Sequence, residues 1–99
     1  MEAFELDELS GSPYLEFLRS EALSAGLYEL PAGGTDPQQP HAEDEVYVVM
    51  SGRAQIRVGD EDRPVGPGTV VYVAAGVEHR FYDIGEDLRV LVIFAPPEG

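Results

Sequence analysis

The stretch QPHAEDEVYVVMSG (residues 39–52) decides the expected fold. His41 stands in a polar segment, and Glu45 opens an apolar run that closes at Gly52. This run is rich in β-branched and aromatic residues, which favour a strand. His79, the second of the two histidines in the chain, lies in a similar run, VYVAAGVEHRFY. The sequence therefore raises the question of whether both histidines and Glu45 meet in the folded chain.

Runs of this kind recur along the rest of the sequence. Strands are expected over residues 22–30, 45–51, 53–58, 69–74, 77–83 and 88–95. Within one of these segments, apolar Ala54, Ile56 and Val58 alternate with polar residues, as in a half-buried strand. The turn signals GDED, GPG and IGED (84–87) separate several segments. Because strands recur about every ten residues with turns between them, the sequence predicts an all-β sandwich or barrel.

The N-terminal part of the chain has a less clear pattern. FELDEL and PYLEFLRS are compatible with short strands or with a helical turn, and we favour strands that extend a sheet edge. A chain of 99 residues corresponds to one domain. We therefore expect a single domain over residues 1–99, with 1–20 as an N-terminal arm or edge strands and 22–95 as the barrel.

The composition excludes several classes of function. A net charge of −13 repels nucleic acid and anionic membranes, so neither is an expected partner. The chain has no cysteine and no lysine, which excludes a thiolate nucleophile, a disulfide and a Schiff base. No apolar run approaches the roughly 20 residues of a membrane span, and the start of the sequence does not resemble a signal peptide. We expect a cytoplasmic protein.

The segment around His41 resembles the first of two sequence motifs of the cupin family. That motif runs glycine, His-x-His, a short gap, glutamate, a longer gap and glycine. His41 takes the place of its second histidine, Glu45 follows after three residues, and Gly52 follows after six more. The leading histidine of the motif falls at Gln39, so an amide stands where the family has an imidazole.

The segment around His79 resembles the second cupin motif, which runs glycine, a gap, proline, one residue, glycine, histidine and asparagine. Gly68, Gly76 and His79 match it, whereas Ala74 replaces the proline and Asp83 the asparagine. The resemblance covers nearly the whole chain. It implies a double-stranded β-helix, a jelly-roll barrel of two facing sheets in which both motifs point into one barrel mouth.

The resemblance also implies a metal site in that mouth, formed by His41, Glu45 and His79, with Gln39 as a weak fourth ligand. Two imidazoles and one carboxylate make up the facial triad of non-heme iron sites, and the same set suits zinc with a bound water. We expect a divalent transition metal: iron, manganese, zinc or nickel. A glutamine amide oxygen binds such metals more weakly than imidazole. The alternative is therefore a cupin that has lost its metal and kept its ligand pocket.

Alternation along the strands adds neighbours to this site. If Glu45 points inward, Tyr47 and Val49 do as well, and an inward His79 brings Phe81 with it. We interpret Tyr47, Val49 and Phe81 as walls of a substrate pocket. Asp83 has the parity to face the same mouth and to orient a histidine, although a turn aspartate is the simpler interpretation.

The sequence predicts a small metal-binding cupin that acts on or binds a small organic molecule. Dioxygenase, isomerase and lyase chemistry all occur on this fold, and the fold does not choose between them. The alternative is a non-catalytic module that binds or senses a small molecule without an obligatory metal. A chain this short buries a modest core, so we also expect a homodimer, with residues 1–20 and 88–94 as apolar edge strands at the contact.

Overall fold

The computed structural model describes residues 1–10, 13–37 and 40–99. The elements are a short 3-10 turn and six strands: η1 (Leu6–Glu8), β1 (Tyr14–Arg19), β2 (Ser24–Leu30), β3 (Asp44–Val58), β4 (Glu61–Val65), β5 (Val70–Val73) and β6 (His79–Ala95). The predicted all-β fold is confirmed, and the strands expected around both histidines are present.

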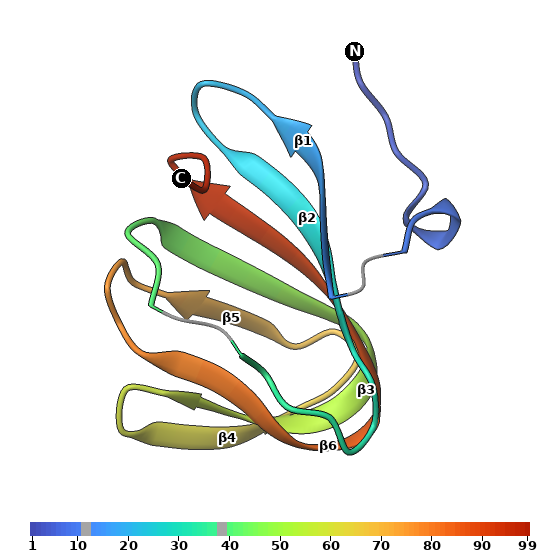
Figure 1. The fold of residues 1–99 in the computed structure, drawn as a ribbon, viewed down its shortest axis with the longest axis vertical. Helices are drawn as coiled ribbons and strands as arrows, with labels where there is room; N and C mark the ends of the chain where they lie inside the picture. Colours follow the sequence, from blue (N-terminus) through green and yellow to red (C-terminus); the bar gives the residue numbers. More distant parts are fainter. Residues whose placement is uncertain (11–12, 38–39) are drawn as a thin grey trace.

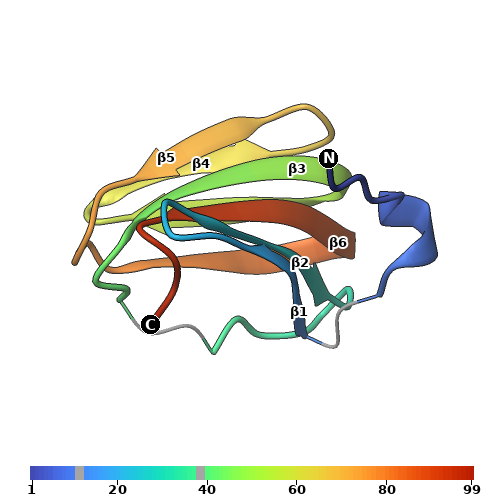
Figure 2. The ribbon, with the colours of Figure 1, turned by 90° about the horizontal axis from the view of Figure 1, so that it is seen from above.

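The strands pair in the order β1-β2-β6-β3-β4, and β5 pairs with the first part of β3. All of these pairings are antiparallel. The long strands β3 and β6 lie side by side and bend together (Figure 1). Figure 2 shows β3 and β6 lying between β1 and β2 on one side and β4 and β5 on the other. The bend divides the sheet into two halves that face each other in Figure 1. One half holds β1, β2 and β5 with the start of β3 and the end of β6, and the other holds β4 with the rest of the two long strands. This arrangement is the jelly-roll barrel that the sequence predicts.

The bend in β3 is centred on Gly52. The register between β3 and β6 shifts on both sides of this residue. Gly52 has a φ of 91°, and a Cβ at this position would collide with the carbonyl oxygen of Asp87 and lie 2.8 Å from Leu88 Cα. Only glycine fits such a close backbone approach at positive φ. The last position of the first motif is therefore explained by the crossing of two bent strands.

The bend also explains two errors of the sequence-based prediction. Residues 45–51 and 53–58 were expected as separate strands, but they form the continuous strand β3. IGED (84–87) was expected as a turn, but it lies within β6, where Glu86 pairs with Arg53. Turn-forming residues here produce a bend in a long strand, because the partner strand bends at the same level.

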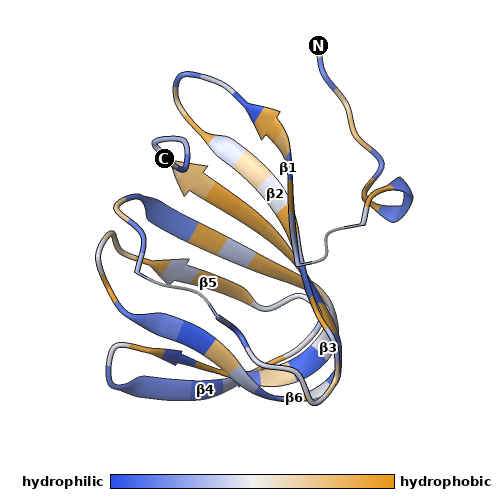
Figure 3. Ribbon diagram, viewed as in Figure 1, coloured by the Kyte–Doolittle hydropathy of each residue, from blue (hydrophilic) through white to orange (hydrophobic). Residues whose placement is uncertain are grey.

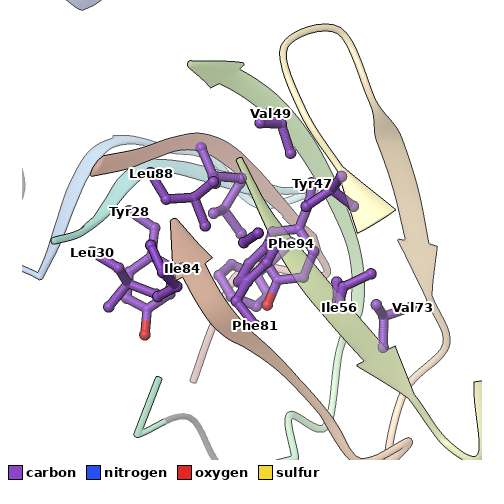
Figure 4. Close-up of a cluster of buried hydrophobic side chains, with 14 residues drawn as sticks. Tyr28, Leu30, Tyr47, Val49, Ile56, Val73, Phe81, Ile84, Leu88 and Phe94 are labelled. Carbon is purple, nitrogen blue, oxygen red and sulfur yellow. The ribbon is translucent and has the colours of Figure 1, made fainter. Parts of the chain in front are cut away.

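Alternating side chains of the strands fill the interior of the curled sheet. Figure 3 shows hydrophobic and hydrophilic positions following one another along the strands. The inward set, drawn in Figure 4, comprises Tyr28, Leu30, Tyr47, Val49, Ala54, Ile56, Val65, Val73, Phe81, Ile84, Leu88, Val90, Val92 and Phe94. The predicted alternation of Ala54 and Ile56 inward with Arg53 and Arg57 outward is confirmed. The burial of this apolar surface is the main force that holds the barrel together.

Three further segments differ from the prediction. Leu6–Glu8 forms a 3-10 turn, so only the second of the two N-terminal segments is a strand, at the edge of the sheet. β4 was not expected as a strand, because EDRPV has no apolar alternation and only Val65 is buried. Residues 88–94 do not form an edge strand, because they pair with β2 on one side and with β3 on the other. The homodimer stays a prediction, and 88–94 offers it no free strand edge.

No helix within the described ranges is both long and apolar enough to cross a membrane.

Candidate metal centre

His41, Glu45 and His79 come together inside the barrel, as the two motifs predict. Each offers one ligand atom, and these atoms all lie within 4.8 Å of one another. Glu45 is the second residue of β3 and His79 the first residue of β6, whereas His41 belongs to the segment before β3. The two motifs are also joined through the backbone, because the amide of Gly76 donates a hydrogen bond of 2.7 Å to the carbonyl of His41.

Glu45 and His79 form a fully buried pair. The side chains are 0% and 1% exposed, and Glu45 Oε1 lies 3.0 Å from His79 Nε2. Despite this distance, neither Glu45 oxygen nor His79 Nε2 has a hydrogen bond of good geometry within the described part of the chain. Buried polar atoms normally have such a partner, and an exception calls for an explanation.

The contact of the other ring nitrogen of His79, Nδ1, determines which nitrogen of the neutral ring carries the proton. His79 Nδ1 lies 2.8 Å from the carbonyl oxygen of Val77. A carbonyl oxygen accepts and never donates, so Nδ1 carries the proton and the lone pair of the neutral ring is on Nε2. That lone pair points toward the carboxylate of Glu45, and two electron-rich groups repel one another. The arrangement is therefore satisfied by a cation between the two groups or by a proton on Nε2.

The electrostatic environment of His79 agrees with this interpretation. Burial is the largest influence and lowers the pKa of His79, but Glu45, the Val77 carbonyl and Asp36 together raise it above its ordinary value. The groups around the His79 ring therefore favour its positively charged form although the ring is buried. A metal ion satisfies the same environment, because metal ligation needs a neutral imidazole and an ionised carboxylate.

His41 is oriented by a residue that the sequence did not point to. His41 Nδ1 lies 3.3 Å from Glu98 Oε2, and its ring packs edge-on against Phe94 at a centroid distance of 4.9 Å. The backbone of Glu98 is held on both sides, by Ser24 Oγ at 3.0 Å and by an Arg19 guanidinium at 2.9 Å. A carboxylate that accepts from Nδ1 leaves Nε2 as the ligand atom, as metal-binding histidines require.

The segment that carries His41 is anchored by Asp36. Its carboxylate accepts a hydrogen bond from the Tyr28 hydroxyl at 2.5 Å and another from the Phe81 amide at 2.9 Å. Tyr28 belongs to β2 and Phe81 to β6, so one side chain ties the segment to two strands of the barrel. The sequence analysis did not identify this anchor, because its two partners lie on strands far from Asp36 or separated from it by a turn.

The remaining predicted site residues have different positions. Tyr47, Val49 and Phe81 are all buried inward, as their parity predicts, and the Tyr47 ring lies 5.9 Å from the His79 ring. Their role in ligand binding stays a prediction. Gln39, the predicted fourth ligand, lies outside the described residues. Asp83 does not orient a histidine, because it is exposed and its φ of 47° breaks the strand alternation.

A cavity of about 120 Å³ adjoins His41. It is lined by Tyr14, Tyr28, His41, Val92, Phe94 and Glu98. Apart from the histidine, none of these residues was predicted. The inward parity of Val92 and Phe94 on the last strand is a signal that identifies two of them. Glu98 follows the last strand in the sequence PPEG, where no pattern indicates its position.

The curled antiparallel sheet and the His–Glu–His cluster within it define a jelly-roll barrel with a potential metal site at its mouth. The family model described as the Cupin domain matches residues 26–94. The chain belongs to the cupin family. Cupins commonly bind metal, and the three clustered side chains are a possible site for one here.

Individual relatives agree with this assignment. An uncharacterised protein of Streptomyces coelicolor is 59% identical over the full length of both chains. The crystal structure of TT1209 from Thermus thermophilus is 27% identical, covers 98% of this chain and 99% of that one, and superposes with a TM-score of 0.80. The dimethylsulfoniopropionate lyase DddQ of Ruegeria pomeroyi is 31% identical over 81% of this chain. The chain spans 45% of that enzyme.

Proposed function

We propose that this protein binds a divalent transition metal through His41, Glu45 and His79 and uses it to act on a small organic molecule. The observation that carries the proposal is the buried pair of Glu45 and His79, whose facing atoms lack a hydrogen bond of good geometry among the described residues. A cation completes this pair, and a third ligand atom lies within 4.8 Å. When bound, the ion supplies Lewis-acid chemistry, polarising a carbonyl or hydroxyl group.

The side chains of this protein have separate tasks in such a site. Glu45 supplies the negative charge, and the carbonyl of Val77 keeps the Nε2 atom of His79 unprotonated in the neutral ring. Glu98 does the same for His41 through its Nδ1 atom. The ring of Phe94 covers His41, and the ring of Tyr47 lies near His79. These aromatic walls exclude water, which strengthens the electrostatic interactions inside.

Among the reaction classes open to the fold, we propose a lyase. Support comes from DddQ, a lyase that acts on a small organic molecule and matches 81% of this chain. The absence of lysine and cysteine restricts proton transfer to carboxylate, imidazole or phenol groups. A non-catalytic module that binds a small molecule is the second candidate. The glutamine at position 39, where the family motif has a histidine, favours it, because the ligand set lacks one imidazole.

Calorimetric titration with Fe²⁺, Mn²⁺, Ni²⁺ and Zn²⁺ tests the proposal on protein purified without an affinity tag. Glu45→Gln removes the ligand charge, and Glu43→Gln is a matched control two residues away that lies outside the cluster. We expect one equivalent of metal in the wild type and in Glu43→Gln, and at least a roughly tenfold weaker affinity in Glu45→Gln. Equal affinity of all three proteins, or no binding by the wild type, overturns the proposal.

A further inference from the structure

The half of the sheet that holds β1, β2 and β5 is hydrophobic on its outer face as well as on its inner one. Strand pairing aligns its outward side chains in rows across the strands. One row runs from Tyr72 on β5 through Val46, Ile93 and Ala25 to Leu18 on β1. The next row starts at Val70, ends at Leu15 and is likewise made of hydrophobic residues. None of these side chains belongs to the interior cluster.

The outer face of the other half shows the ordinary pattern of a barrel in water. Arg53, Gln55 and Arg57 alternate with the buried Ala54 and Ile56 along the second part of β3. Outward side chains of an antiparallel sheet are normally polar where that face meets solvent. The two halves therefore differ, and the hydrophobic outer face of the half with β5 calls for an explanation.

The N-terminal segment of the chain packs on one end of this face. The ring of Phe4 lies 5.0 Å from the ring of Phe17 in β1, and the guanidinium of Arg89 donates a hydrogen bond of 2.9 Å to the carbonyl of Leu9. Leu27, in the second row, is 0% exposed although it points away from the interior cluster. The face is thus a packing surface within one chain at its β1 and β2 end.

The end of the face at β5 stays open to solvent. Val70 is 62% exposed, Tyr72 is 59% exposed, and Met50 at the same end of β3 is 38% exposed. These three are among the exposed large hydrophobic side chains of the described chain, and they lie on two paired strands. A contiguous hydrophobic patch on the surface of a small protein marks an interaction site.

The free edge of β5 lacks the features that normally keep strand edges apart. Among the described strands, β5 pairs with β3 alone. Charged side chains and proline on an edge strand discourage pairing with other chains, and the edge strands β1 and β4 carry them: Glu16 and Arg19 in one, Arg63 and Pro64 in the other. Residues 64–77, which contain β5, include no charged residue, although 25% of the chain is charged. The edge of β5 is therefore unprotected where the other two are protected.

We propose that the outer face around Val70, Tyr72 and Met50 binds a second copy of this chain about a two-fold axis. A net charge of −13 makes two copies repel one another over most of their surfaces. The two hydrophobic rows carry no charge, so the repulsion is weakest where they face each other. A two-fold axis places the same patch on both partners, and hydrophobic side chains are complementary to themselves whereas carboxylates are not. Leu91 and Ile93 take part through their outward side chains and not through a strand edge.

Sedimentation equilibrium of the full chain tests this interface. We expect the wild type at about 50 µM to have twice the mass of the 10.8 kDa chain, since a stable interface persists at this concentration. Val70→Glu and Met50→Glu each bring a carboxylate from both copies into the contact and should weaken the dimer at least about tenfold. Gln55→Glu adds the same charge to the outer face of the other half, so it should leave the dissociation constant nearly unchanged.

Spin labels locate the contact without adding charge to it. The chain has no cysteine, so Val70→Cys and Gln55→Cys each give one labelling site per copy. In the dimer the two labels at position 70 should be closer together than the two labels at position 55, as measured by pulsed electron double resonance. Urea denaturation of each variant checks that the fold is retained, which we expect because Val70 and Met50 are exposed.

A wild type with the mass of one chain at this concentration overturns the inference. Equal dissociation constants in the wild type and both patch variants overturn it too, as does a similar weakening by Gln55→Glu, which would show that any added charge separates the copies. Labels that are closer at position 55 than at position 70 place the contact on the other half and overturn it as well. Because no residue of this patch belongs to the His–Glu–His cluster, failure of the metal proposal leaves the inference standing.

Discussion

Replacing Gly52 by alanine tests the account of how β3 and β6 cross. The added Cβ would meet the carbonyl oxygen of Asp87 and lie 2.8 Å from its carbonyl carbon and from Leu88 Cα. These are backbone atoms of a paired strand, so the collision is not relieved by a side-chain rotation. Overpacking of this kind costs about 1–3 kcal/mol. The φ of 91° adds a conformational cost of about 1–3 kcal/mol for a residue with a side chain.

Gly68→Ala is the matched control for this substitution. Gly68 has a similar φ of 89°, but nothing lies within 4 Å of the position of its Cβ. Gly68→Ala therefore carries the conformational cost of the positive φ but causes no collision with neighbouring atoms. We expect Gly52→Ala to lose about 1–3 kcal/mol more of the free energy of unfolding than Gly68→Ala. In urea denaturation this difference corresponds to a midpoint lower by roughly 1 M, since the slope for a small domain is about 1–3 kcal/mol per molar. Equal losses in the two variants would refute the close crossing.

Two further predictions concern the site and its anchor. Because the pKa of His79 is raised, its imidazolium pair with Glu45 stabilises metal-free protein below about pH 6.5, and this contribution is lost as the pH rises through the raised pKa. The increase in melting temperature caused by Zn²⁺, measured by scanning fluorimetry, should therefore become larger between roughly pH 5.5 and 8. An increase that does not change with pH would contradict the imidazolium–carboxylate pair of His79 and Glu45. Asp36→Ala leaves the Tyr28 hydroxyl and the Phe81 amide without their acceptor and should destabilise the fold by about 1–3 kcal/mol for each donor. In the same denaturation assay the exposed turn variant Asp60→Ala should change stability by no more than about 0.5 kcal/mol, and a similar loss in both variants would show that Asp36 is no anchor.

The central part of the fold was predictable because its determinants are local. Alternation placed Ala54 and Ile56 inward and, on the same principle, Tyr47 and Phe81. The spacing of His41 and Glu45 resembled a family motif, which brought the cluster with His79 into the prediction. The inward positions depend on residues a few places apart, whose relative orientation is fixed by strand geometry. The meeting of His79 with His41 and Glu45, which are far from it in the chain, was implied by the family resemblance and not by local geometry.

The parts that were missed depend on contacts between distant residues. β6 continues through Gly85 because β3 bends beside it, and IGED by itself is a turn signal. β4 is a strand because it pairs with the second half of β3, although its own sequence is charged. Glu98 reaches His41 only because Ser24 and Arg19 hold its backbone across the barrel. Local propensity is a weak guide wherever tertiary pairing decides the conformation.

The buried pair of Glu45 and His79 argues for function more strongly than for stability. Removing two ionisable groups from water costs several kcal/mol each, roughly, and their mutual attraction often fails to repay that cost. Well-packed apolar side chains of the same size would serve the core of a domain this small at least as well. Two contacts nevertheless orient the clustered side chains: the Val77 carbonyl accepts from the Nδ1 atom of His79, and the Glu98 carboxylate lies beside the Nδ1 atom of His41. A protonated His79 would keep its contact with the Val77 carbonyl as well, but a purely structural pair does not account for the ligand atom of His41 within 4.8 Å. The proposed cation between the imidazoles and the carboxylate accounts for all three side chains, and it would also balance the negative charge of Glu45.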